Sequence, residues 1–212
     1  MLIRSGRYQY FNTAKHMLDI TDCRDLMTIQ SIFFMILFLQ ATAKLATCYA
    51  YIGIALRACC RLGLHRNLPN KFHPIEQEER KRMFFLIRKI DGYVGAMLGL
   101  PEMLSEEDID QELPREVDDE YITEEGIRPM PAGSFPLLKA TNAHTKLTGI
   151  LRKVVRHIYP IKGPANVSSG ERYSISHRRI RELERDLQAW MDELPMELRP
   201  SDNAGRELSR YV

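Results

Sequence analysis

Four acidic side chains between positions 106 and 110 form the densest group of residues that could do chemistry. Glu106, Glu107, Asp108 and Asp110 could together hold a divalent cation, because hard cations prefer carboxylate oxygens. Their spacing lacks the glycine and the alternation of ligands found in a calcium-binding loop. We therefore predict no metal site here, and interpret these residues as capping a short turn that begins after Ser105 and as solvated surface.

His65 and Asp91 are the two residues that could move a proton. His65 follows an expected helix end beside Arg66, where it could be a ligand or a pH switch; we favour a capping or inter-helix hydrogen bond that fixes the chain reversal. Asp91 falls within an apolar helix, where an unpaired carboxylate is costly. No second carboxylate or histidine lies at a useful spacing, so we predict a buried structural pair and no catalytic residue. The candidate partners are Arg57, Arg61, Arg80 and Arg88.

The four cysteines are too scattered for metal-ligand spacing. Cys59 and Cys60 are adjacent, so on a helix they point about 100° apart and could not both ligate one ion without distortion. Cys23 and Cys48 lie far from them in sequence. We predict buried free thiols and no cofactor in this chain.

Charge is unevenly distributed, although the formal net charge of the 212 residues is only +2. Residues 101–126 contain twelve Asp or Glu against one Arg, and residues 139–185 contain eleven Lys or Arg against three Glu. One interpretation is an acidic loop and a solvated basic helix face; the other is that the two patches attract each other or a partner. The basic cluster alternates with Glu182, Glu184 and Asp186, which indicates a self-paired helix surface, with phosphate binding as the alternative. Its members are His177, Arg178, Arg179, Arg181 and Arg185.

The elements that position these residues are predicted to be helices throughout. Apolar periodicity predicts a first helix through Tyr8 and Leu18, then helices over 25–40, 43–62, a segment ending at Gly99, 137–159 and 176–194. The apolar run at 32–39 is only eight residues long, against about 20 for a membrane span, so we expect a core helix and no membrane contact. The fold class is therefore all-α, an irregular domain of about six helices. We expect the domain to be truncated at both ends, because the sequence opens and closes within helical segments.

Two segments between these helices are predicted to be irregular. Residues 115–136 are rich in acidic residues, proline and glycine and are predicted to form a mobile loop, and residues 160–172 are predicted to form a flexible linker. The third helix is predicted to stop at LGLHR (62–66), with Gly63 in a left-handed conformation and Leu64 folded back onto the last turn.

The order of several short motifs resembles a known family. LGLHR (62–66), EERKRMFF (78–85), DGY (91–93) and DIDQELP (108–114) follow one another as in the middle homology region of fungal zinc-cluster transcription factors. The resemblance covers residues 10–114. It implies that residues 1–114 are the N-terminal half of such a domain, with 137–212 as its helical continuation. Phe84 and Phe85 stand where the family often has tryptophan, and Leu100 replaces the arginine of its G-R-P turn. The positions matching the family motifs are Gly63, Leu64, His65, Arg66, Glu79, Arg80, Asp91, Tyr93, Asp108, Asp110 and Pro114.

The resemblance implies a regulatory domain that acts in the nucleus and is not an enzyme. Zinc and DNA would be bound by an upstream six-cysteine cluster that this chain lacks. The resemblance assigns no ligand-binding residue; a metabolite, a co-regulator protein or a second copy of the chain are the partners it leaves open. Two other functions stay open from the residues alone. One is a helical enzyme or small-molecule-binding domain with an apolar pocket, and the other is an architectural interaction domain.

Overall fold

The computed structural model describes residues 2–20, 22–69, 71–159 and 177–199. It divides into two compact units, within residues 1–138 and 139–212. The linker predicted at 160–172 lies outside the described residues. In the described part the fold is all-α, as predicted, with six α-helices, three short 3₁₀ turns and one very small hairpin.

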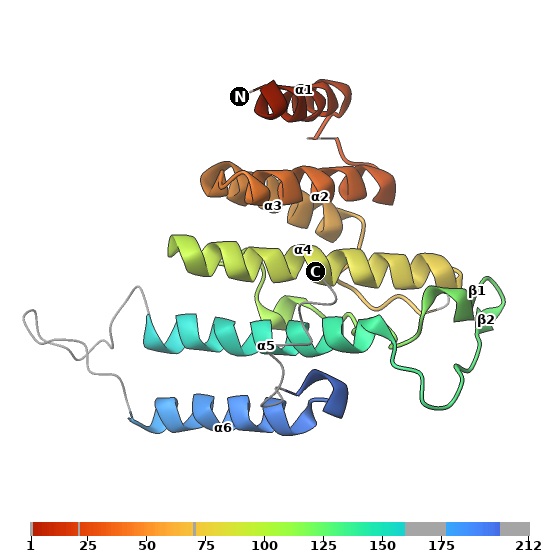
Figure 1. Cartoon of the computed structure of the whole chain (residues 1–212), viewed down its shortest axis with the longest axis vertical. Coiled ribbons are helices and arrows are strands. Elements are labelled where there is room, and N and C mark those ends of the chain that lie inside the picture. The colour runs from red at the N-terminus through yellow and green to blue at the C-terminus, as the bar shows by residue number, and fades with distance from the viewer. Residues whose placement is uncertain (1, 21, 70, 160–176, 200–212) are drawn as a thin grey trace, which may run out of the picture. The chain divides into compact units, whose positions relative to one another are not determined.

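The first unit contains four helices, α1 (Leu2–Met17), α2 (Leu26–Ala41), α3 (Leu45–Arg61) and α4 (Pro74–Leu98) (Figure 1). Asp25 caps α2 by accepting a hydrogen bond from the Thr28 N–H at 2.7 Å. Pro74 occupies the first turn of α4, where its missing N–H costs nothing and its fixed φ suits the helix. The predicted bounds of α2 and α3, and the predicted ends of α1 and α4, agree with the observed ones within one or two residues.

The core of this unit is the contact of α2 and α4 with the central helix α3. Ile32, Ile52 and Phe84 have no exposed surface, and Phe84 meets Phe85 edge-to-face with ring centroids 5.3 Å apart. The apolar segment at 32–39 is thus a core helix. In the described part of the chain no helix is both long and apolar enough to cross a membrane.

The third helix ends as predicted. Gly63 has a φ of +74°, and its N–H donates to the Cys60 carbonyl at 3.0 Å. The Leu64 N–H donates to the Cys59 carbonyl at 2.9 Å, and the Leu64 side chain is fully buried. These two hydrogen bonds form a Schellman motif, which satisfies the last carbonyls of the helix. Gly99, with a φ of +66°, ends α4 with the same hydrogen-bonding pattern.

The segment at 115–136 contains structure that the sequence did not predict. A 3₁₀ turn (Asp119–Tyr121) leads into two strands, β1 (Ile122–Thr123) and β2 (Gly126–Ile127), which pair antiparallel. Two residues per strand are too few to show alternation, so the sequence predicts only a loop here. The mobility of this segment stays a prediction.

The second unit is a helix pair, α5 (Leu137–Ile158) and α6 (His177–Glu193), which run antiparallel (Figure 1). Trp190 Nε1 donates to the Ala143 carbonyl at 2.8 Å, and Lys153 Nζ lies 2.6 Å from Asp186 Oδ2. Arg178 pairs with Glu182 within α6 as predicted, whereas Asp186 turns to α5 instead of pairing within its own helix.

Candidate functional site

After Gly99 the chain reverses and residues 101–117 run back along α4; we call this segment the strap. Four α4 side chains hold it, at positions 78, 81, 88 and 91. The strap runs antiparallel to α4, so the earlier an α4 residue lies in the helix, the later its partner lies in the strap. Spacings of three and seven residues place the four positions along one face of the helix. The strap is therefore tied to α4 over much of its length.

The four ties are of two chemical kinds. The two carboxylates of α4 accept backbone N–H groups, Asp91 Oδ2 from Met103 at 3.1 Å and Glu78 Oε2 from Arg115 at 2.8 Å. The two cations pair with strap carboxylates, Arg88 with Glu106 at 2.8 Å and Lys81 with Glu112 at 3.3 Å. The α4 side chains are buried, whereas the Glu106 and Glu112 side chains are each 65% exposed.

Apolar contacts add to these ties. Met103, Leu104, Ile109 and Leu113 of the strap pack against the hydrophobic core. Gly53 of α3 leaves a notch for Met103, because a Cβ at this position would lie 3.1 Å from the Met103 sulfur. Thus the strap covers part of the α3–α4 surface and contributes to the core.

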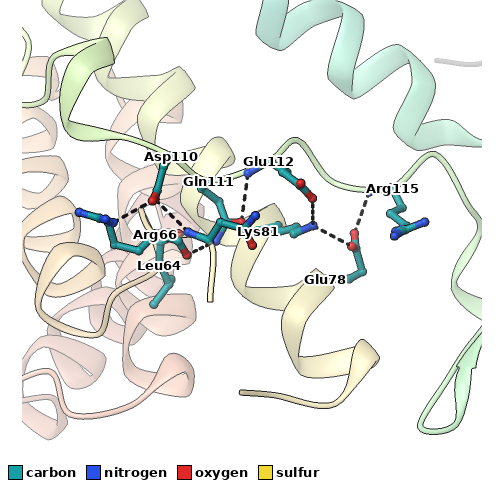
Figure 2. Close-up of polar contacts among 9 residues, drawn as sticks. Leu64, Arg66, Glu78, Lys81, Asp110, Gln111, Glu112 and Arg115 are labelled. Carbon is teal, nitrogen blue, oxygen red and sulfur yellow. Dashed lines mark hydrogen bonds and ion pairs between the residues drawn. The ribbon is translucent and has the colours of Figure 1, made fainter. Parts of the chain in front are cut away.

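The middle of the strap meets the LGLHR turn (Figure 2). The His65 carbonyl accepts the N–H groups of Asp110 and Gln111 at 3.3 and 3.2 Å. The Gln111 side-chain amide donates to the carbonyls of Leu64 and Arg66 at 3.0 and 2.8 Å. Residues of two separate motifs of the sequence are thereby joined in space, and we call this junction the buckle.

Asp110 closes the buckle from the other side. Its Oδ1 accepts the Asn67 N–H at 2.9 Å and lies 3.0 Å from Arg66 Nε (Figure 2). The hydrogen bond from Asn67, supported by the charge of Arg66, lowers the pKa of the Asp110 carboxyl below its ordinary value. Asp108 instead accepts the Ser105 N–H at 3.2 Å and so caps the 3₁₀ turn Glu106–Asp108, as the sequence predicted.

His65 acts through its backbone. The sequence predicted a capping or inter-helix hydrogen bond here. The observed bonds instead join the His65 carbonyl to the strap, while the buried Nδ1 of the imidazole has no partner among the described residues. Burial, with the neighbouring Arg66 as the second cause, lowers the pKa of His65. The ring is therefore favoured in its neutral form.

Arg80 joins the end of α3 to the start of α4. Its guanidinium donates to the Leu62 carbonyl, lies 3.7 Å from Glu76 Oε1 and stacks 3.9 Å from the centroid of the Phe72 ring. A small recess beside it is lined by Arg66, Leu68, Phe72, Gln77, Arg80 and Gln111. This lining is largely polar, unlike the apolar pocket that a small-molecule-binding function would call for.

The comparisons with known proteins identify the family of the chain. The family described as "Fungal specific transcription factor domain" matches residues 4–192. The chain belongs to this family. The match extends well beyond residues 10–114, which carried the resemblance in the sequence, and reaches through nearly all of α6.

Several similar curated proteins are fungal transcription regulators by name. "Activator of stress genes 1" of Saccharomyces cerevisiae is 46% identical over 209 residues, which cover 96% of this chain and 21% of the relative. "Activator of stress genes protein 1" of Candida albicans is 42% identical over 92% of the chain and 21% of its own length. "Transcriptional activator protein acu-15" of Neurospora crassa is 30% identical over 82% of the chain and 18% of its own length. No solved structure matches the chain.

Within this fungal transcription factor domain, the motif residues do not all meet at one place. The buckle brings together Leu64, His65, Arg66 and Asp110, and Asp91 and Asp108 belong to the strap or its tie to α4. Glu79 is exposed, Tyr93 is half-buried and Pro114 is buried at the end of the strap, and none of them joins the buckle hydrogen bonds described above. Asp91 takes a backbone N–H from the strap, a partner that the sequence analysis did not name.

Several positions that hold the strap were missed from the sequence. Glu78, Lys81, Gln111 and Glu112 carry much of the junction, yet charged and amide side chains are ordinarily assigned to solvent. The available signal was that charged residues at positions 78, 81, 88 and 91 are spaced by three, seven and three residues and so share one face of α4. The other faces of this helix are largely apolar, so that a charged face need not be the solvent face.

The described residues contain no group of three or more His, Cys, Asp or Glu that could hold a metal ion. All four cysteines are free; Cys23, Cys48 and Cys59 are buried and Cys60 is half-buried. Burial raises the pKa of the Cys48 thiol to about 11 and also raises the pKa of Cys59. A thiol must lose its proton to bind a metal, so these positions are unfavourable ligands.

Proposed function

We propose that this chain is the regulatory domain of a fungal transcription factor that acts in the nucleus. Family membership carries the proposal, supported by relatives whose names describe transcriptional activators. The chain spans about a fifth of the length of these relatives, so sequence-specific DNA binding and its zinc are assigned to another part of the whole protein. On the same grounds the domain is not an enzyme.

The proposed mechanism is a shift between packings of the strap on α4. A regulatory signal, from a metabolite or a co-regulator protein, can act only by binding one packing more tightly than another. The strap suits this role, because its strap-side carboxylates Glu106 and Glu112 are 65% exposed while the α4 cations they neutralise are buried. A partner that binds Glu106 or Glu112 would weaken its ion pair with the buried α4 cation and favour a packing in which the strap is held less tightly.

A chimera tests the proposed function. The matched 209-residue segment of the Saccharomyces cerevisiae relative is replaced by this chain, and transcripts that depend on that relative are measured. We expect the chimera to restore them, and a chimera carrying Lys81→Glu to fail at equal protein level in the nucleus. The proposal would be wrong if deleting the segment left transcription and its response to stress unchanged.

A second function, an architectural interaction domain, is favoured by one observation. The outer side of α2 exposes Met27 and Phe34, each by 69%, and Leu37 by 39%. Such an apolar stripe suits contact with another helix, including a second copy of the chain. Sedimentation of the wild type and of Phe34→Gln tests this, because a change from dimer to monomer would support the interaction role.

A further inference from the structure

The two units of the chain carry opposite charge. Residues 1–138 contain 16 Lys or Arg against 19 Asp or Glu, a formal net charge of −3. Residues 139–212 contain 14 against 9, a net charge of +5. The helix α5 contributes strongly, because its 22 residues contain no acidic side chain. The near-neutral net charge of the whole chain is therefore the sum of a weakly acidic first unit and a basic second unit.

The positive charge is concentrated at one end of the helix pair. The contacts of Lys153 with Asp186 and of Lys146 with Glu193 show that the last turn of α5 lies beside the first half of α6. Arg156 of α5 is thereby brought to the same end as Arg179, Arg181 and Arg185 of α6. We call these four arginines the basic end.

The basic end is available to a partner. All four side chains are exposed, and they form no ion pair among the described residues, whereas neighbouring Arg178 and Lys153 are already paired with Glu182 and Asp186. Exposed arginines retain their hydration and their counterions, which a polyanion can displace. The planar guanidinium is also the cation best suited to phosphate oxygens.

We propose that the basic end contacts backbone phosphates of duplex DNA without reading the base sequence. This inference rests on the proposed function, since it gives the regulatory domain its own contact to the DNA that another part of the protein selects. Duplex DNA is favoured over an acidic peptide because no large apolar side chain is exposed among residues 177–186, and the exposed ones beside this segment are two separate side chains, Tyr159 and Leu187. A peptide needs apolar anchors to bind well, whereas DNA gains affinity from charge alone by releasing counterions.

The salt dependence of binding tests the proposal. Anisotropy of a labelled duplex of unrelated sequence, about 20 base pairs long, is measured with the 212-residue chain from about 25 to 150 mM KCl. Four phosphate contacts predict a slope of log K against log salt of roughly −3.6 for the wild type, and unrelated duplexes should bind alike. The variant Arg156→Gln/Arg179→Gln/Arg181→Gln/Arg185→Gln is expected to bind at least about tenfold more weakly at the lowest salt, with a slope near zero.

A matched control removes the same charge from the first unit. Its substitutions are Lys15→Gln, Arg57→Gln, Lys71→Gln and Arg128→Gln, all at exposed positions. This control should keep the wild-type slope of log K against log salt. A variant with four Arg→Lys changes at the basic end should keep it too, because the positive charge is retained. Glutamine and arginine have similar helix propensities, so α6 should persist, and circular dichroism checks it. If the quadruple variant unfolds, each single Arg→Gln change is expected to reduce the magnitude of the slope by about 0.9.

Three results would overturn the proposal. The first is that the wild type does not bind the duplex at the lowest salt, or binds it with an affinity that does not depend on salt. The second is that the matched control loses as much affinity as the quadruple variant. The third is that polyglutamate competes as strongly as DNA at equal charge. The last result would assign the basic end to an acidic polypeptide. None of them bears on the chimera experiment, which measures transcription, so the failure of this inference is distinguishable from failure of the proposed function.

Discussion

Lys81 and Glu78 form an ion pair inside the protein, with Lys81 Nζ 3.6 Å from Glu78 Oε1 and side chains that are 3% and 4% exposed. Glu112 completes the group from the strap, 3.3 Å from the same ammonium. A buried charge that loses its partner is far more costly than the pair itself is stabilising. The strap is therefore held by a group whose members depend on one another.

Lys81→Met is expected to lower the free energy of unfolding by about 3–5 kcal/mol, because Glu78 is left buried without a cation. Glu112→Gln should cost less than about 1 kcal/mol, because solvent already screens its exposed carboxylate. Guanidinium denaturation followed by circular dichroism measures both. The double variant Glu78→Gln/Lys81→Met is the control and should recover most of the loss. Equal costs for Lys81→Met and Glu112→Gln would show that burial does not govern this group.

Local signals explain what could be predicted from the sequence. The end of α3 at Gly63, the cap at Asp25 and the apolar helix α2 all depend on residues within one or two turns of each other. The strap could not be predicted in this way, because its ties join positions far apart in the chain, such as Glu78 and Arg115. Periodicity also misleads at Lys81 and Arg88, because it assigns charged residues to the solvent side of a helix and here they are buried.

Gly63→Val is expected to destabilise the chain by about 1–2 kcal/mol, because a φ of +74° is strained for any residue with a Cβ. A new Cβ would meet only Leu68 Cδ1 at 3.6 Å, an ordinary contact, so the cost arises from the backbone. Thermal unfolding measures it, and Gly63→Ala should show a smaller loss of the same sign. Gly149→Ala is the control: this glycine lies within α5 with no atom near its Cβ position, and the change should be stabilising. An unchanged melting temperature in Gly63→Val would mean that LGLHR is not a conformational stop.

The purified chain is expected to hold no stoichiometric zinc, even when it is expressed with added zinc. The cysteines lack ligand spacing, and burial raises the pKa of Cys48 to about 11, so that its thiolate is unfavourable at neutral pH. Elemental analysis of the purified protein measures the zinc content. One zinc ion per chain that survives dialysis against a weak chelator would contradict the assignment of the metal to another part of the protein.

Stability should decrease as the solution is acidified from about pH 7.5 to about pH 5, and His65 should account for part of the decrease. Burial lowers the pKa of His65 in the folded chain, so the unfolded state binds the proton more readily. The contribution of His65 is therefore fully present above the ordinary histidine pKa, about 6.5, and is lost as pH falls through the folded pKa. The pKa of Asp110 is lowered from an ordinary value of 3.8, so this residue changes the stability only at pH values below the range from about 7.5 to about 5.

His65→Gln is expected to reduce the difference in unfolding free energy between the two pH values, measured by guanidinium denaturation. His16→Gln is the matched control, because His16 is exposed near the end of α1, and it should leave the difference unchanged. If both variants keep the full difference, the imidazole of His65 does not contribute to the pH dependence of the fold.

Ala43 ends α2 with the hydrogen bonds that Gly63 and Gly99 provide for the next two helices. Its N–H donates to the Gln40 carbonyl and the Lys44 N–H to the Leu39 carbonyl, both at 2.9 Å, and its φ is +56°. Alanine in this left-handed conformation costs about 1–2 kcal/mol, whereas glycine adopts it freely.

Ala43→Gly is therefore expected to stabilise the chain, by about 0.5 kcal/mol after the greater entropy of glycine in the unfolded chain is subtracted. Guanidinium denaturation measures the change. Ala50→Gly is the control, because Ala50 is an exposed residue within α3, where the same substitution should destabilise by about 1 kcal/mol. Opposite signs for the two variants would establish that Ala43 is strained. A similar loss in both would mean that the turn between α2 and α3 tolerates alanine without cost.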